Sequence, residues 1–302
     1  MSNKEIIKYE LNSSSRLDKW LSEETEFSRS IVQKMIKNET LFVNSKLVKS
    51  SYQLQYGDVI EYEYIQDTID LTPQKVDFEI VYEDSNLIVI NKPLGLVVHP
   101  GVGNKDMTLV NGLLYYFDSL SSLDEVRPGI VHRIDKNTTG LLLVAKTNAV
   151  HVMLQEMIKN REVSREYIAL VHGNIKHNSG TINAPIGRDK NNRQLMCVCD
   201  QNSKDSVTHF EVLEKSIDFS LIKCKLETGR THQIRVHMKY INHPIVGDPV
   251  YGYRKTIGNT QLLHAFRLSF IHPISKEEMI FVCDLPTHFK DVLEELNFEY
   301  KL

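Results

Sequence analysis

The sequence contains little cysteine and no long apolar run. Its 302 residues include only four cysteines, and none of them forms a CxxC pair. Neither a disulfide framework nor a cysteine-rich zinc domain is therefore expected. No stretch approaches the ~18 apolar residues that a membrane helix needs, and the first residues, MSNKEIIKYELNSSS, lack the apolar core of a signal peptide. We expect a cytoplasmic protein without a membrane segment.

Common cofactor and metal motifs are also missing. The sequence contains no GxSxG, HExxH or phosphate-binding loop, and GVGNKD at residues 101–106 lacks the third glycine of a dinucleotide fingerprint. The segment that starts at Asp135 begins like a calcium loop, but its twelfth position is Lys146, where a bidentate glutamate is required. His232 and His237 are five residues apart, which is the wrong spacing for one helical face. We expect neither a metal nor a cofactor.

The formal net charge of -3 conceals an uneven distribution of charge. Residues 185–255 contain 12 lysines and arginines against 8 acidic residues, and residues 276–302 contain 3 against 7. A polyanion responds to local charge and not to the net charge of the chain. The near-neutral total therefore does not exclude a nucleic-acid partner, although charged runs are usually only solvated surfaces.

Residues 1–64 have the pattern of a small α+β module. Ser14 or Ser15 can cap a first helix, Ser28 can cap a second, and Asn38 suits a left-handed position after the second helix. LFVNSKLV then predicts a hairpin and GDVIEYEY a closing strand. Such a module could serve any purpose, or it could bind RNA through basic side chains. The candidate RNA-binding residues are Arg29, Lys34, Lys37, Lys46 and Lys49.

A polar segment at residues 65–76 separates this module from residues 77–302, and we interpret the segment as a linker. In the second region, FEIVYED and NLIVINKP predict two strands, TLVNGLLYYF a helix and REYIALVHG another strand. GRTHQIRVHMKY predicts a helix capped at Thr231. This alternation favours an α+β domain with a mixed, mostly antiparallel sheet.

The stretch VHRIDKNTTGLLLVAK, residues 131–146, places an acid directly before a strongly apolar run. Residues 141–145 predict a short buried strand, and residues 137–140 predict the turn that leads into it. Asp135 is then expected at the edge of a rigid sheet, where it can be held in place and still meet a substrate. An arginine partner would keep its carboxylate ionised when a substrate excludes water. The candidate partners are Arg133, Arg230 and Arg235.

Several motifs together resemble the RluA-type pseudouridine synthases. HRIDKNTTGLLLVAK resembles the catalytic motif of that family. The other similar motifs, in the family's order within residues 77–288, are NLIVINKPLGLVVHPG, REYIALVHG, GTINAPIGRD, LETGRTHQIRVHMKYINHPIVGDPVYG and LLHAFRLSFIHP. Residues 14–64 resemble the small RNA-binding module, named for a ribosomal protein, that often precedes this catalytic domain. The combination is most similar to the RluD group, which acts on large-subunit ribosomal RNA.

The resemblance implies a role for individual residues. Asp135 matches the catalytic aspartate, Tyr167 the active-site tyrosine, and Arg235 the arginine that pairs with the aspartate. Tyr167 also offers a flat ring that can stack on a base. Arg133 matches the arginine that helps hold the nucleic acid open. The implied substrate-binding residues are Arg133, His132, Arg230, His232, Gln233 and Lys92.

The implied reaction breaks the bond from the sugar to the uracil nitrogen, turns the base, and rejoins it through carbon. Its implied partner is RNA, most simply large-subunit ribosomal RNA, and a monomer is expected. One alternative is a non-catalytic ribosome-assembly or RNA-binding factor with the same fold, which the presence of Asp135, Tyr167 and Arg235 argues against. Another is a hydrolase with paired carboxylates, which needs a second acid near Asp135. The target uridine, and whether Asp135 is a nucleophile or a base, stay open.

Overall fold

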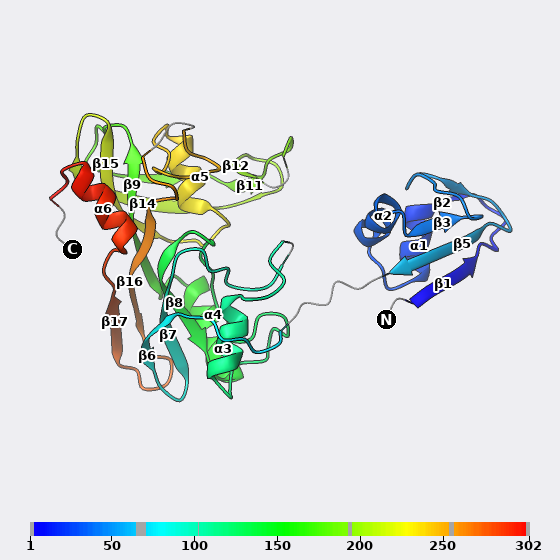
Figure 1. The fold of residues 1–302 in the computed structure, drawn as a ribbon, viewed down its shortest axis with the longest axis horizontal. Helices are drawn as coiled ribbons and strands as arrows, with labels where there is room; N and C mark the ends of the chain where they lie inside the picture. The colour runs from blue at the N-terminus through cyan, green and yellow to red at the C-terminus, as the bar shows by residue number, and fades with distance from the viewer. Residues whose placement is uncertain (1–2, 65–70, 102, 193–194, 254–256, 300–302) are drawn as a thin grey trace. The chain divides into compact units, whose positions relative to one another are not determined.

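The computed structural model describes residues 3–64, 71–101, 103–192, 195–253 and 257–299. The chain divides into two compact units, residues 1–68 and residues 69–302 (Figure 1). Each unit has its own hydrophobic core.

The first unit is a small antiparallel sheet with two helices. The sheet has the strand order β1-β5-β3, and a short separate pair joins β2 to β4. Its core contains Trp20, which meets Tyr9 edge to face at 5.0 Å between ring centroids. The elements are β1 (Asn3–Lys8), β2 (Ser15–Arg16), α1 (Leu17–Glu24), α2 (Arg29–Lys37), β3 (Leu41–Val43), β4 (Gln53–Leu54) and β5 (Val59–Tyr64).

A backbone contact, and not a serine side chain, begins the first helix. α1 starts at Leu17, and Arg16 before it is extended because it belongs to β2. The amide of Leu17 donates to the carbonyl of Tyr52 at 2.8 Å. This bond satisfies one of the N–H groups that the start of a helix leaves without an intrahelical partner. The prediction that Ser14 or Ser15 caps this helix was wrong.

The end of the second helix also differs from the prediction in one residue. Ser28 caps the start of α2, as predicted, and accepts a bond from the amide three residues later. At the other end, Asn38 has a φ of -87°, and the left-handed residue is Glu39, with a φ of 58°. The hairpin predicted for LFVNSKLV forms only in part. Asn44 and Ser45 both have positive φ, at 49° and 61°, and make its turn. Its second strand is not formed, because Lys46 makes only an isolated bridge with Val43 and β3 pairs with β5 instead.

A buried carboxylate, Asp18, holds two arginines on the surface of the first unit. It accepts bonds from Arg16 at 3.1 and 3.0 Å and from the Gln33 amide at 3.0 Å, and Arg29 approaches to 3.4 Å. The bonds from Arg16 lower the pKa of Asp18 to about 2, although burial opposes this shift. Arg16 therefore belongs to the same basic surface as Arg29. The sequence pattern indicated Arg29 but not Arg16.

We expect Asp18→Asn to destabilise the first unit by about 1 to 2 kcal/mol at neutral pH. The pKa of about 2 in the folded state lies below the ordinary value of 3.8. The stabilisation is therefore fully present above about pH 4 and is lost as the pH falls towards 2. The chain has a single tryptophan, Trp20, so tryptophan fluorescence during urea unfolding monitors this unit. The exposed substitution Glu10→Gln is the control, and an equal loss at pH 2 and pH 7 would show that charge is not the cause.

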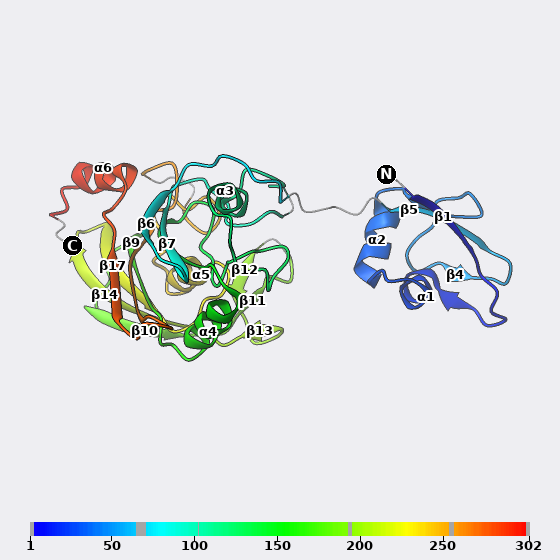
Figure 2. The same ribbon diagram turned by 90° about the horizontal axis from the view of Figure 1, so that it is seen from below.

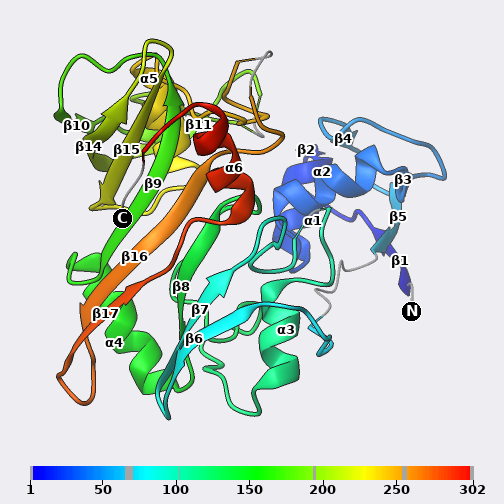
Figure 3. The same ribbon diagram turned by 60° about the vertical axis from the view of Figure 1, so that its left-hand side comes forward.

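One mixed, mostly antiparallel sheet organises the second unit, which confirms the predicted fold class. Its strand order is β10-β14-β15-β9-β16-β8-β7-β6, and β17 also pairs with β16 (Figure 3). Among the described pairs of this sheet, only β8 and β16 run parallel. The strands are β6 (Glu79–Glu83), β7 (Leu87–Lys92), β8 (Thr139–Ala145), β9 (Ser164–His172), β10 (Ser179–Asn183), β14 (Val207–Lys215), β15 (Phe219–Leu226), β16 (Leu263–Ile271) and β17 (Glu278–Val282).

Helices cover both faces of this sheet. Helices α3 (Leu109–Tyr116) and α5 (Gln233–Tyr240) share a core with one face, and α4 (Asn148–Lys159) and α6 (Thr287–Glu295) pack on the other. Figure 2 shows α5 inside the curve of the sheet and α6 outside it. None of the helices that the structure describes has the length and apolarity needed to span a membrane. A smaller sheet contains β11 (Ile186–Arg188), β12 (Met196–Val198) and β13 (Ser203–Lys204).

Strand β8 begins two residues earlier than the predicted run. Thr139 and Gly140 pair with His264 and Ala265 of β16, so they are strand residues and not part of the predicted turn. A Cβ on Gly140, which has a φ of 107°, would lie 2.2 Å from the carbonyl oxygen of Ala265. Glycine is needed there because the two backbones approach so closely. All of β8 is buried, and it gives firm support to the segment before it, which contains Asp135.

The segment that we interpreted as a linker lies partly outside the described residues, which resume at residue 71. Its described part packs on the second unit. The side chain of Asn111 donates to the carbonyl of Thr72 at 3.0 Å, and the amide of Gln74 donates to the carbonyl of Asn111 at 3.1 Å. Val76 is buried in the core of this unit. Residues 72–76 are therefore part of the second unit.

Candidate active site

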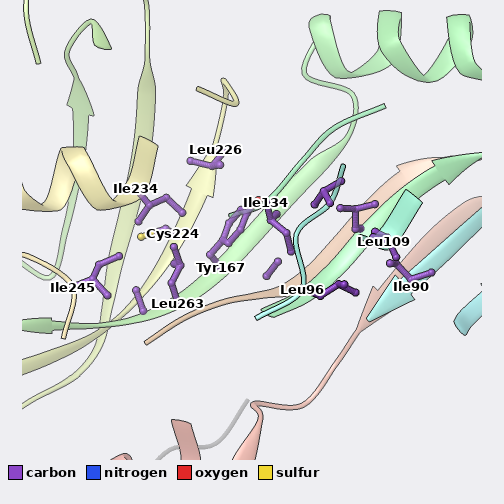
Figure 4. Close-up of a cluster of buried hydrophobic side chains, with 14 of the residues drawn as sticks. Ile90, Leu96, Leu109, Ile134, Tyr167, Cys224, Leu226, Ile234, Ile245 and Leu263 are labelled. Atoms are coloured by element: carbon purple, nitrogen blue, oxygen red, sulfur yellow. The ribbon is translucent and has the colours of Figure 1, made fainter. Parts of the chain in front are cut away.

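A pocket of about 50 Å³ and an adjoining groove of about 420 Å³ meet around Asp135. They adjoin because they share Arg133, Ile134, Asp135, His232 and Arg235 among their lining residues. The apolar wall of the pocket belongs to the main core of the second unit. Figure 4 shows that core, in which Ile134, Tyr167, Leu226, Ile234 and Leu263 are among the labelled side chains. The pocket is therefore built on a packed core and not on a loose surface.

The segment before β8 fixes the position of Asp135. Thr138 closes a turn by donating its amide to the carbonyl of Asp135 at 3.1 Å, and the side chain of Gln261 donates to the hydroxyl of Thr138 at 2.7 Å. The Asp135 carboxylate stays 18% exposed and faces the hollow. It therefore combines a fixed backbone with access to a substrate, as expected from the sequence.

Arg235 connects Asp135 to a second carboxylate that the sequence analysis did not identify. Its Nη1 donates to Asp135 at 2.8 Å, and its Nε and Nη2 donate to the two oxygens of Asp248 at 2.7 and 2.9 Å. The structure thus selects Arg235 from the three candidate partners of Asp135. Asp248 also accepts bonds from the amides of Val250 and Tyr251 at 2.9 and 3.0 Å. The bidentate bond fixes the direction of the guanidinium towards Asp135.

The charges of this trio stabilise one another. Burial alone would raise the pKa of Asp248, but the bonds from Arg235 and from two backbone amides lower it. Burial would likewise lower the pKa of Arg235, but its bonds to Asp248 and the charge of Asp135 raise it. Both oxygens of Asp248 already accept hydrogen bonds from Arg235, and one also accepts from two backbone amides, so Asp248 is not available as a second catalytic acid. A hydrolase with paired carboxylates would need such an acid beside Asp135, and the geometry does not favour that alternative.

Tyr167 forms part of the pocket wall. It lies on β9, opposite Cys224 of β15, and is only 5% exposed. Burial raises the pKa of its hydroxyl, so the ring is neutral at ordinary pH. A neutral aromatic ring at the wall of a pocket is suited to stacking on a flat base.

His232 lies beside Asp135 in a left-handed conformation, with a φ of 58°. Its Nε2 is 3.9 Å from Asp135, and its Nδ1 is 2.8 Å from the hydroxyl of Tyr251. Burial lowers the pKa of His232, so the ring is neutral near pH 7. His232 also occupies the N-cap position of α5, so the prediction that Thr231 caps this helix was wrong. The unusual backbone conformation places the imidazole at the edge of the pocket.

Three other predicted residues line the pocket, and they differ in how firmly hydrogen bonds hold their side chains. Arg133 is exposed and donates weakly to Nε2 of His99 at 3.4 Å, and Arg230 donates to the carbonyl of Asp205 at 3.1 Å. Gln233 is 3% exposed, and its amide is fully bonded to Thr228, Arg230, Val207 and Thr208. Gln233 therefore holds the start of α5 in place, while the two arginines can reach a ligand.

Lys92 and His132 line neither the pocket nor the groove. The Lys92 ammonium is completely buried and donates to the carbonyls of Pro93, Leu96 and Lys136 at 2.9 to 3.0 Å. Burial lowers the pKa of Lys92 to about 7. Nε2 of His132 accepts a bond from the amide of Leu143, and burial lowers the pKa of its ring to about 3. Both residues predicted to contact the substrate thus bond to backbone groups instead: Lys92 bonds to the carbonyl of Lys136, next to Asp135, and His132 to the amide of Leu143 in β8.

The five basic residues predicted for the first unit are all exposed. They belong to the separate compact unit, residues 1–68, whereas the pocket is formed by residues of the second unit. Arg29 is partly engaged by Asp18, as described above. The exposed residues are Arg29, Lys34, Lys37, Lys46 and Lys49.

Comparison with known proteins identifies the family. The RNA pseudouridylate synthase family matches residues 86–240. The uncharacterized RNA pseudouridine synthase YlyB of Bacillus subtilis is 48% identical, over 98% of this chain and 99% of that protein. Ribosomal large subunit pseudouridine synthase D of Escherichia coli O157:H7 is 40% identical, over 95% of this chain and 92% of that protein. Human RNA Pseudouridylate Synthase Domain Containing 1 is similar in structure, with a TM-score of 0.57 and 28% identity over 73% of this chain and 95% of that chain. The chain belongs to the RNA pseudouridylate synthase family and is an RNA pseudouridine synthase.

Proposed function

We propose that this enzyme converts one or more uridines of large-subunit ribosomal RNA to pseudouridine, with Asp135 as its central catalytic residue. The observation that carries this proposal is the chain of contacts from Asp135 through Arg235 to Asp248 at the mouth of a pocket that contains Tyr167. We also propose that the enzyme is a monomer. A ribosomal substrate also supports a cytoplasmic location.

The reaction balances within the substrate. The bond from C1′ of the ribose to N1 of uracil breaks, the base turns, and a bond from C1′ to C5 forms. C5 then loses its proton and N1 gains one. Asp135 acts on the sugar or on the ring, and the bond from Arg235 holds its carboxylate in one orientation at the pocket. We further propose that Tyr167 stacks on the base and that its neutral hydroxyl assists proton transfer from the ring.

The groove beside the pocket suits the RNA strand on either side of the target nucleotide. The target base must leave its stack to reach a pocket, which costs a few kcal/mol. Arg133 and Lys136 are exposed at the groove and can contact phosphates, which offsets this cost. Asn104 and Gln261 add neutral polar groups along the same groove. We propose that Arg133 and Arg230 bind the strand that carries the target uridine.

Two relatives support the choice of ribosomal RNA. Both the Escherichia coli protein described above and a protein of Neisseria meningitidis, 42% identical over 91% of this chain and 76% of that protein, are named ribosomal large subunit pseudouridine synthase D. The test is a map of pseudouridine in all stable RNAs from cells with and without this protein. We expect one or more sites to disappear from large-subunit ribosomal RNA. If that RNA is unchanged and transfer RNA loses a site, the ribosomal substrate is wrong.

We also propose that the first unit adds RNA affinity and takes no part in the chemistry. Substituting Lys37 and Lys46 with glutamine should weaken RNA binding. The slope of log affinity against log salt concentration should fall by the amount that corresponds to up to about two lost phosphate contacts. The rate of the bound complex should stay unchanged. The matched control substitutes the exposed Lys159 and Lys290 of the second unit. RNA affinity is measured at several salt concentrations for the two double variants. An identical salt slope for the Lys37 and Lys46 variant and for the control would contradict the proposal.

A further inference from the structure

The pocket contains a buried arginine that no described residue neutralises. Arg165 lies on β9, is 5% exposed, and lines the pocket. Its Nε is buried and has no hydrogen-bond partner in the part of the chain that the structure describes, and no carboxylate of that part pairs with its guanidinium. Burying a charge without a partner is costly, and proteins normally avoid it. An arginine in this position requires an explanation beyond the folding of the chain.

Each of the other arginines of the pocket has a polar partner, although Arg133 and Arg230 can still reach a ligand. Arg235 is held by Asp135 and Asp248, Arg230 bonds to a backbone carbonyl, and Arg133 contacts His99. Arg165 alone combines deep burial with an unused donor among these four. Its side chain and that of Tyr167 are two residues apart on β9 and therefore point to the same face of the sheet. A base that stacks on Tyr167 would lie within reach of Arg165.

A glycine leaves room for this guanidinium. A Cβ added to Gly229 would lie 2.8 Å from Nη1 of Arg165, and Gly229 also lines the pocket. The φ of Gly229 is not in the left-handed region, so the backbone does not by itself require glycine. The absence of a side chain at Gly229 therefore leaves the space that the Arg165 guanidinium occupies.

We propose that Arg165 binds a carbonyl oxygen of the flipped uracil and stabilises the negative charge of the base during the reaction. The proposal rests on the function proposed above and names the group that recognises the base. When the bond from C1′ to N1 breaks, its electron pair stays on the uracil and spreads over N1 and the two carbonyl oxygens. The pair then forms the bond from C5 to C1′. Arg165 donates hydrogen bonds throughout and neither gains nor loses a proton.

Burial decides between the base and a phosphate as the ligand of Arg165. Phosphates stay on the solvated side of a bound strand, where the exposed Arg133 and Lys136 lie. Arg165 is in the pocket, beside the ring that the base contacts. A donor placed in a pocket from which water is excluded acts most strongly on charge that develops during the reaction. The geometry therefore favours the uracil oxygens.

The test compares Arg165→Met with Arg267→Met. Arg267 lies on the neighbouring strand β16, has a carboxylate partner in Glu166, and does not line the pocket. At saturating RNA, Arg165→Met should lower the single-turnover rate about 10²- to 10³-fold, as expected when a donor to developing charge is removed. Its RNA affinity should change less than about threefold, because phosphate contacts supply most of the affinity. Arg267→Met should match the wild type in both measurements.

Gly229→Ala serves as a second variant in case Arg165→Met folds poorly. The added methyl meets only the flexible end of the Arg165 side chain within 3.0 Å, so the fold should survive while the guanidinium moves. We expect a rate between those of the wild type and Arg165→Met, with an unchanged melting temperature. A wild-type rate for Gly229→Ala would argue against the proposed position of the guanidinium.

Sulfur substitution in the substrate identifies the contact directly. The substrate is whichever RNA the wild-type enzyme is shown to modify, with 2-thiouridine or 4-thiouridine at the target, so an error in the ribosomal assignment leaves this test intact. At the contacted oxygen, the thio-substitution and Arg165→Met should not be additive, because each removes the same bond. Additive effects at both positions would overturn the proposal. So would a normal saturated rate for Arg165→Met combined with weaker affinity and a reduced salt slope, which would indicate a phosphate contact.

Discussion

Asp135→Asn should abolish pseudouridine formation and leave both the fold and RNA binding nearly intact. The amide has the shape of the carboxylate but cannot act as a nucleophile or a base. Arg235 keeps its two bonds to Asp248 in the variant, so the loss of stability should stay within about 1 kcal/mol. RNA affinity should be unchanged or slightly higher, because affinity depends on phosphate contacts and one negative charge is removed.

The measurement is single-turnover release of tritium from RNA labelled at C5 of the target uridine. A melting curve and a binding titration on the same samples show whether the variant is folded and bound. The exposed substitution Asp118→Asn removes the same charge elsewhere on the second unit and should release tritium at the normal rate. Near-normal release by Asp135→Asn would show that another residue performs the central step.

Substitutions of Arg235 and Asp248 should have the second largest effect. Their effect on stability can be separated from their effect on the reaction rate. Arg235→Met leaves the buried Asp248 without its cation, which should destabilise the enzyme by about 3 to 5 kcal/mol. The double variant Arg235→Met with Asp248→Asn removes both charges, and the asparagine oxygen can still accept from the amides of Val250 and Tyr251. Most of the lost stability should therefore return.

Activity should not return with stability. In the double variant, Asp135 lacks the guanidinium that fixes its orientation, so the single-turnover rate should stay about 100-fold or more below that of the wild type. Urea unfolding and single-turnover assays on the two single variants and the double variant measure both effects. A double variant that is stable and nearly as active as the wild type would show that Arg235 serves the fold and not the reaction.

The sequence predicted the position of Asp135 better than the contacts around it. The pattern before β8 indicated that Asp135 would lie at the edge of a buried strand, and the described structure places it there. Without the family resemblance, the sequence left Arg133, Arg230 and Arg235 as equal candidates, because 100 residues separate Arg235 from Asp135 and only the folded chain brings them together. Asp248 was missed for a related reason. An aspartate that starts a turn is common, and nothing local shows that it also anchors an arginine of a helix.

Errors in the predicted elements have the same origin. The first helix needs no serine cap because a carbonyl from a distant segment bonds its first amide. Thr139 and Gly140 look like turn residues by composition, but they pair with β16, more than 120 residues later in the chain. Arg165 has the pattern of an ordinary strand residue, and its burial without a carboxylate partner becomes visible only in three dimensions. Local signals thus located the elements, while long-range contacts decided their ends and their chemistry.

The position of β16 has a consequence for the timing of synthesis. This strand comes from residues 263–271, yet it lies in the middle of the sheet, between β9 and β8. A growing chain that has emerged only as far as residue 260 contains Asp135, Tyr167 and Arg235, but it lacks the strand that joins the parts of the sheet that carry them. Domains of a growing chain fold as units once their parts are available. We therefore expect the catalytic contacts to form only near the end of translation, so that an incomplete nascent chain is inactive.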